Sequence, residues 1–126
     1  MTKGEFVGAV LHAVTQAHIL HLQTRDYAAH KALEELYEAL GDHADEIAEV
    51  SQGAYGLIAD YPASYPAPSS TDPVTWLTGF SQAVESGRAD MPQDSEIQNL
   101  IDELVATIER AFYKLKFLSG PAPLTP

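Results

Sequence analysis

Apolar residues recur every three or four positions along four stretches of the chain, the spacing that gathers them on one face of an α-helix. The first stretch predicts a helix over about residues 3 to 23. A break at "QTRDY" follows, in which Asp26 is a candidate N-cap for a second helix that ends near "GAYG". The apolar positions expected to face the core include Val10, Val14 and Leu22 in the first helix, and Leu33, Leu36, Leu40, Ile47, Ala54 and Ile58 along the second.

Two further helices are predicted in the second half of the chain. Asp72 as N-cap, with Pro73 in the first helical position, starts a shorter helix that Gly87 ends. Pro92 is expected to open the fourth helix, and Gly120 to end it. Residues 1–120 are therefore predicted to form one domain, followed by a flexible tail over 121–126.

The segment "DYPASYPAPSSTDP", residues 60–73, contains four prolines and lacks the alternation of a strand. It is expected to be a long crossover between the second and third helices. Four amphipathic helices with one such crossover match a ferritin-like four-helix bundle, and no strand is predicted. The fold class predicted from the sequence is therefore all-α. Trp76, near the start of the third helix, is expected to pack into the bundle or at a subunit contact.

Composition narrows the possible functions. The chain has 18 acidic and 7 basic residues, a formal net charge of −11, and no cysteine. This charge opposes nucleic-acid binding, which needs clustered Lys and Arg, and the lack of cysteine excludes disulfides and thiolate metal sites. No apolar run approaches membrane length and no secretory signal is apparent, so a soluble cytoplasmic protein is expected. An acidic protein can still attract metal cations.

Most of the acidic residues of the second helix lie opposite its apolar face. Glu34, Glu38, Asp45 and Glu49 gather there, and such a stripe is usually a solvated surface. The alternative is a metal site, because His18 and His21 fall on or near the apolar stripe of the first helix and His30 lies on the flank of the second. A lone histidine on an apolar face is more often a core residue than a ligand. Histidines facing a carboxylate stripe, however, form a ligand set that suits iron, manganese or zinc.

The spacing of these residues restricts where a metal ion could bind. The break at "QTRDY" can fold His30 back beside His18, and Asp45 and Glu49 lie one helical turn apart. His30 and Asp45 are 15 residues apart on one helix, about 22 Å, so they cannot share an ion within one chain. A site that uses all four residues must join two chains, as in a two-fold dimer with antiparallel second helices.

These residues resemble a known family, the Dps mini-ferritins (DNA-binding proteins from starved cells). The family signature His-x11-His-x14-Asp-x3-Glu is matched by His18, His30, Asp45 and Glu49. The stretch "HKALEELYEALGDHADEIAE" also resembles the family's sequence around its second ligand histidine. The close resemblance covers residues 18–49, and elsewhere it rests on helix order and the crossover.

The resemblance implies a ferroxidase, an iron oxidoreductase whose site is shared across a two-fold interface. His18 and His30 of one subunit and Asp45 and Glu49 of its partner would hold Fe(II), with Glu34 near a second iron. The family oxidises Fe(II), preferably with hydrogen peroxide, and stores ferric mineral in a shell of twelve subunits, which limits oxidative damage. A homo-oligomer is therefore expected, at least a two-fold dimer, with a dodecameric cage as the assembly that the resemblance implies. His21 and His43 are given no metal role, and His43 is taken as a structural or surface histidine.

The chain also departs from that family. It is shorter, has Ile19 where the family usually has Trp, and lacks a basic N-terminal tail, so DNA binding is not expected. Two alternatives therefore remain. One is a non-enzymatic helical scaffold or binding protein that kept the bundle, for which the Pro/Tyr-rich segment is the candidate contact loop. The other is a dimer in which the same ligands hold a structural zinc or manganese ion.

Overall fold

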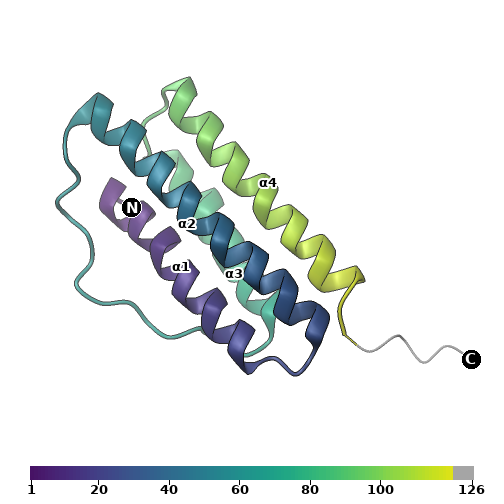
Figure 1. Cartoon of the computed structure of the whole chain (residues 1–126). Helices are drawn as coiled ribbons and strands as arrows, with labels where there is room; N and C mark the ends of the chain where they lie inside the picture. Colours follow the sequence, from purple (N-terminus) through teal and green to yellow (C-terminus); the bar gives the residue numbers. More distant parts are fainter. Residues whose placement is uncertain (121–126) are drawn as a thin grey trace, which may run out of the picture.

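The computed structural model describes residues 1–120, and these form four α-helices, one short 3-10 helix and no strand. The tail predicted over 121–126 lies outside the described residues. Figure 1 shows the order of the elements, which are α1 (Lys3–Gln23), α2 (Tyr27–Tyr55), α3 (Pro73–Gly87), η1 (Arg88–Asp90) and α4 (Ser95–Phe117). The prediction of an all-helical chain is confirmed for this part of the sequence, and a helical bundle fits the arrangement.

The first three helices begin and end where the sequence predicted. Thr2, Asp26 and Asp72 each accept a hydrogen bond from the backbone N–H three residues later, at 3.1, 3.0 and 2.9 Å. These bonds satisfy N–H groups that have no partner inside the helix. Pro73 occupies the first turn of α3, where its missing N–H costs nothing. The local chemistry of the caps therefore accounts for these boundaries.

The fourth helix begins later than predicted. It starts at Ser95 rather than at Pro92, because the first helical carbonyl is that of Asp94, which accepts from the backbone N–H of Gln98 at 3.0 Å. The carbonyl of Pro92 accepts from the Gln98 side chain instead, at 3.0 Å. The Asp94 carboxylate makes no cap and accepts a hydrogen bond from the Tyr55 hydroxyl at 2.6 Å, which ties the end of α2 to the start of α4.

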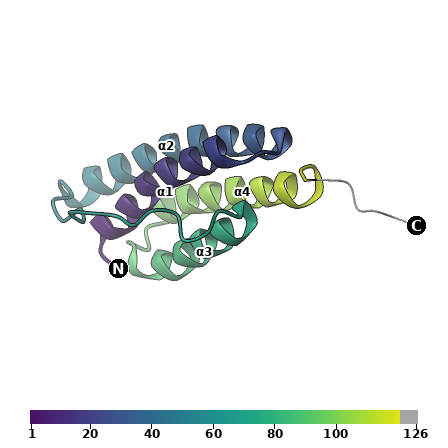
Figure 2. The same cartoon turned by 90° about the horizontal axis from the view of Figure 1, so that it is seen from below.

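The segment between α2 and α3 runs back along the length of the molecule beside α1, so α2 and α3 point in the same direction (Figures 1 and 2). Gly4 and Gly8 of α1 make room for it, since a Cβ on Gly8 would lie 1.7 Å from the Tyr65 hydroxyl. The Gln16 side chain donates to the Pro66 carbonyl at 3.1 Å, and His12 bonds the same carbonyl. The long connection is thus packed on α1 as an ordered segment.

The core lies between two layers, with α1 and α2 in one and α3 and α4 in the other (Figure 2). Its fully buried side chains come from all four helices and include Phe6, Leu20, Leu33, Leu40, Ile47, Leu77, Ile97 and Ile101. Trp76 is buried in the bundle, as predicted, and its indole N–H donates to the Gln16 side chain at 3.0 Å.

Three positions expected on or near the apolar faces are exposed. Leu22 is 71% exposed, and both His18 and Ala54 are exposed. Leu22 and Ala54 lie near the ends of α1 and α2, and each helix has neighbours on only part of its circumference. None of the helices within residues 1–120 combines the length and apolar character needed to cross a membrane.

Candidate metal centres

Aromatic side chains gather at the corner where α1 meets α2. The His21 and His30 rings stack with centroids 3.6 Å apart, and His18 stacks on Tyr37 at 4.3 Å. His21 and His18 meet edge to face at 5.6 Å, so His21 lies between His18 and His30. We call His18, His21, His30 and Tyr37 the corner cluster. The three residues between α1 and α2 form a turn short enough to bring the histidines of both helices together.

Two reciprocal hydrogen bonds hold this corner. Nδ1 of His21 donates to the carbonyl of His30 at 2.7 Å, and Nδ1 of His30 donates to the carbonyl of His21 at 2.8 Å. Because a carbonyl can only accept, both rings carry a proton on Nδ1. In the neutral form of such a ring, the Nε2 atom keeps a lone pair. A backbone carbonyl on the far nitrogen is the usual support for a metal-binding histidine.

The burial of these histidines separates their roles. His21 is only 6% exposed, whereas His30 is half-buried and His18 is exposed. His21 is therefore the structural member of the corner cluster. His18 and His30 are the two that reach the surface, and the corner brings them to the same end of the α1–α2 pair.

Glu34 lies one turn after His30 and forms a salt bridge with Lys31. Lys31 Nζ donates to its carboxylate at 2.7 Å. That hydrogen bond and the charge of Lys31 lower the pKa of the Glu34 carboxyl, with smaller contributions from His21 and His30. Glu34 is thus an ionised carboxylate beside the corner cluster.

Asp45 and Glu49 are exposed on α2, about 22 Å and more from His30 along the helix. The structure does not bring them to the histidines within one chain. The predicted site is therefore divided: His18 and His30 lie at the corner with His21 between them, and Asp45 and Glu49 lie farther along α2. This separation agrees with the distance calculated from the axial rise per residue of an α-helix.

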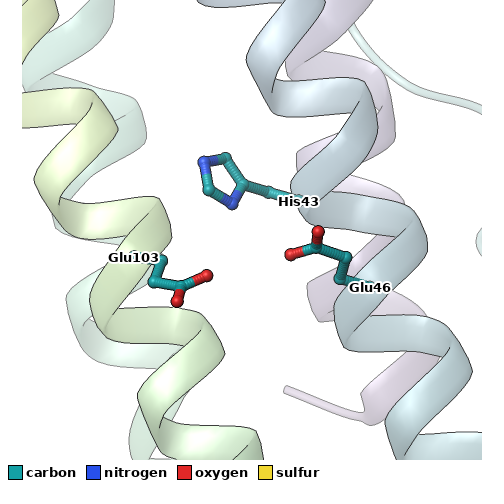
Figure 3. A group of neighbouring side chains, drawn as sticks. All are labelled: His43, Glu46 and Glu103. Atoms are coloured by element: carbon teal, nitrogen blue, oxygen red, sulfur yellow. The ribbon is translucent and has the colours of Figure 1, made fainter.

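The structure assembles a different group of metal-ligating side chains within the chain. In the part that it describes, His43, Glu46 and Glu103 place one ligand atom each within 4.8 Å of one another. Figure 3 shows the ring of His43 and the carboxylates of Glu46, from α2, and Glu103, from α4, turned toward a common space. Burial lowers the pKa of His43 against the opposing effect of nearby carboxylates, so its ring stays neutral at neutral pH.

The sequence pattern indicated no metal-binding role for His43 and did not single out Glu103. Nε2 of His43 lies 2.7 Å from the Thr107 hydroxyl, so the ring bridges α2 and α4 rather than lying free on the surface. The i, i+3 spacing of His43 and Glu46 was a visible signal. Glu103 follows 57 residues after Glu46, and only the pairing of α2 with α4 brings the two together.

Comparison with known proteins places this chain in a family with no assigned function. Residues 21–115 match the family of unknown function DUF5856, and this match spans most of the chain. A protein of enterobacteria phage T4, described as an uncharacterized 14.6 kDa protein in the mobD-ri intergenic region, is 29% identical over 116 residues. The alignment covers 90% of this chain and 84% of the phage protein. No solved structure matches.

The chain therefore belongs to the DUF5856 family. The assignment to the Dps mini-ferritins, made from the spacing of four residues, is wrong, because the match that covers most of the sequence is to a different family. The physical reason is that the four-residue pattern lies on exposed or half-buried positions, which carry little information about the rest of the fold.

Proposed function

We propose that this member of the DUF5856 family binds Fe(II) at a site shared between two copies of the chain and oxidises it. The reciprocal hydrogen bonds between His21 and His30 carry the proposal. They fix the His30 ring with Nε2 available, at the same end of the α1–α2 pair as the exposed His18. In ferrous proteins, neutral imidazole and carboxylate ligands are the common combination.

The second half of the site comes from another copy in this proposal. Asp45 and Glu49 lie one turn apart on the exposed side of α2, so both carboxylates can reach one ion. Two chains with antiparallel α2 helices would form two equivalent sites, each with His18 and His30 from one chain. Glu34 is placed to offer a further carboxylate beside the histidines.

The exposed face of α1 supports an interface at this position. Leu11 and Leu22, 43% and 71% exposed, lie on the same side of the helix as His18 at intervals of seven and four residues. Apolar side chains of this size are covered when a second copy packs on the face. The parallel α2 and α3 helices, with the long connection between them, also fit a ferritin-like bundle.

Fe(II) is the substrate in this reaction. One hydrogen peroxide molecule accepts two electrons, so two Fe(II) ions become Fe(III) while the peroxide and two protons yield two water molecules. The role of the chain is to hold Fe(II) with open coordination positions for the oxidant. The surplus of acidic residues raises the local concentration of cations. The proposed function is therefore iron storage with protection from peroxide, carried out by a homo-oligomer.

Stoichiometric oxidation of Fe(II) tests the proposal, followed by absorbance of the ferric product with peroxide or with air alone. Wild type is compared with the Asp45→Ala/Glu49→Ala double variant, whose helicity is checked by circular dichroism. The matched control is Glu85→Ala/Glu109→Ala, which removes two exposed carboxylates from α3 and α4. We expect fast oxidation in wild type and control, and a loss of at least tenfold in rate in the double variant.

Equal and slow oxidation in all three proteins would overturn the proposal. The protein would then be a helical scaffold or binding protein. Light scattering on the same samples gives the oligomeric state, and a monomer under every condition would also rule out a shared site. Zinc or manganese binding that is lost in the Asp45→Ala/Glu49→Ala variant, without iron oxidation in wild type, would identify the structural-metal alternative.

A further inference from the structure

We propose that His43, Glu46 and Glu103 form a second metal site, complete within one chain, that binds a first-row divalent transition metal between α2 and α4. The inference does not depend on the shared iron site, because it uses none of its residues. It rests on the convergence of three ligand atoms within 4.8 Å of one another and on the way the His43 ring is held.

The Thr107 hydroxyl sets the orientation of the His43 ring, and Arg110 in turn holds that hydroxyl. Nε2 of His43 lies 2.7 Å from the Thr107 oxygen, and Nη2 of Arg110 donates to the same oxygen at 3.1 Å. A hydroxyl oxygen has two lone pairs and can accept from both groups. In that arrangement Nε2 carries the proton, and the lone pair of Nδ1 points toward the two carboxylates (Figure 3).

This arrangement is the one that supports metal-binding histidines in general. A histidine ligand donates its other ring N–H to an oxygen atom, which fixes the tautomer and the ring plane. Thr107 is buried and comes from α4, as does Glu103, so the helix that supplies one carboxylate also positions the imidazole. The ligand set is thus preorganised by the packing of α2 against α4.

The surroundings leave space for the remaining ligands of an ion. The three side chains line a groove of about 410 Å³, which is also lined by Asp42, Thr107 and Arg110. Three protein ligands at an open groove leave coordination positions for water. One imidazole with two carboxylates favours Zn(II), Mn(II), Fe(II) or Co(II) over Ca(II) and Mg(II), which prefer oxygen ligands alone.

The charged groups at the groove favour a cation. Glu46, Glu103 and Asp42 each carry a negative charge, while Arg110 is the cation among the lining residues. The guanidinium of Arg110 contacts Thr107, which bonds Nε2 of His43, so this positive charge lies on the opposite side of the ring from the two carboxylates. A divalent ion would therefore meet a net negative groove, and would join helices that lie far apart in the sequence.

Co(II) binding, followed by visible absorbance, tests the site. The experiment uses the full chain carrying Asp45→Asn/Glu49→Gln, which removes the carboxylates of the shared iron site. We expect one Co(II) per chain, at least tenfold weaker binding on adding Glu103→Gln, and unchanged binding on adding Glu109→Gln as the matched control. Glu103 and Glu109 are both exposed, so neither change threatens the fold.

A second measurement uses ZnCl2 and thermal unfolding. An ion that binds only the folded chain raises the unfolding temperature, and in the Asp45→Asn/Glu49→Gln background Glu103→Gln should remove that rise. His43→Gln should do the same. Co(II) binding that is unaffected by Glu103→Gln, or the absence of binding, would overturn the inference. The iron-oxidation rate of Glu103→Gln alone is expected to equal that of wild type, so the two proposals can fail separately.

Discussion

His21 and His30 are joined twice, by a ring stack with centroids 3.6 Å apart and by hydrogen bonds in which each ring donates to the backbone carbonyl of the other residue. His21 lies in the last turn of α1 and His30 in the first turn of α2. The pair therefore fixes the angle at which the chain turns from one helix into the next, and it orients the ring that we propose as an iron ligand.

Replacing His21 by Ala should therefore destabilise the fold. The variant loses a buried ring and the hydrogen bond that this ring donates to the His30 carbonyl, so the free energy of unfolding should fall by about 2–3 kcal/mol. His18→Ala, at an exposed position of the same cluster, should cost less than about 1 kcal/mol. Urea denaturation followed by circular dichroism measures both. Equal losses in the two variants would mean that the reciprocal bonds contribute nothing.

The stability of the metal-free protein should depend on the protonation of His43. Burial lowers the pKa of this histidine below its ordinary value of 6.5, so the unfolded chain binds the proton more readily than the folded chain. This contribution to stability is complete above pH 6.5 and is lost as the pH falls from there through the folded-state pKa.

Urea denaturation in EDTA at several pH values between 7.5 and 5, for wild type and His43→Gln, measures this effect. Other titrating groups are common to both proteins and cancel in the difference. We expect wild type to lose stability relative to the variant as the pH is lowered. A difference that stays constant with pH would show that the His43 ring titrates equally in both states.

Two helical glycines should respond in opposite directions to alanine. A Cβ on Gly4 would lie 2.7 Å from the backbone carbonyl of Asp60, whereas one on Gly41 would meet no atom within 4 Å. Gly4→Ala should lower the free energy of unfolding by about 1–3 kcal/mol through overpacking. Gly41→Ala should raise it by about 0.5–1 kcal/mol, because alanine loses less backbone entropy in a helix. A similar gain in both variants would indicate that the long connection does not pack on α1.

Ser51 is a buried residue whose hydroxyl has no hydrogen-bond partner among the described residues. Ser51→Ala removes an unsatisfied polar group and should raise the free energy of unfolding by about 1 kcal/mol beyond the effect of helix propensity. Ser86→Ala, at an exposed position in α3, supplies the propensity effect alone. Thermal and urea unfolding compare the two variants. A loss of stability in Ser51→Ala would mean that the hydroxyl is satisfied in solution.

Local sequence was sufficient for most of the helix boundaries. Asp26 and Asp72 cap their helices because a carboxylate can reach a backbone N–H three residues later, whatever the rest of the fold does. The start of α4 was misplaced because Pro92 also fits a first helical position. There the Gln98 side chain, which bonds the Pro92 carbonyl, decided the outcome.

For the candidate sites too, local sequence was sufficient for some conclusions and not for others. The separation of His30 from Asp45 follows from the rise of a single helix, so the sequence was enough to exclude an intrachain site that uses both. The family assignment was a different kind of inference. It relied on the spacing of four residues, on a similar stretch around them and on helix order, and the match over residues 21–115 contradicts it.

The sequence by itself determined the presence of four helices, the caps at Asp26 and Asp72 and the long proline-rich connection, because each depends on interactions within a few residues. Only the tertiary structure decided which side chains from different helices meet. Glu103 joins His43 and Glu46 because α4 packs beside α2 in one register. His21 became buried and His18 exposed because the corner turns one ring inward. Such contacts depend on the packing of whole faces, which periodicity along one helix does not contain.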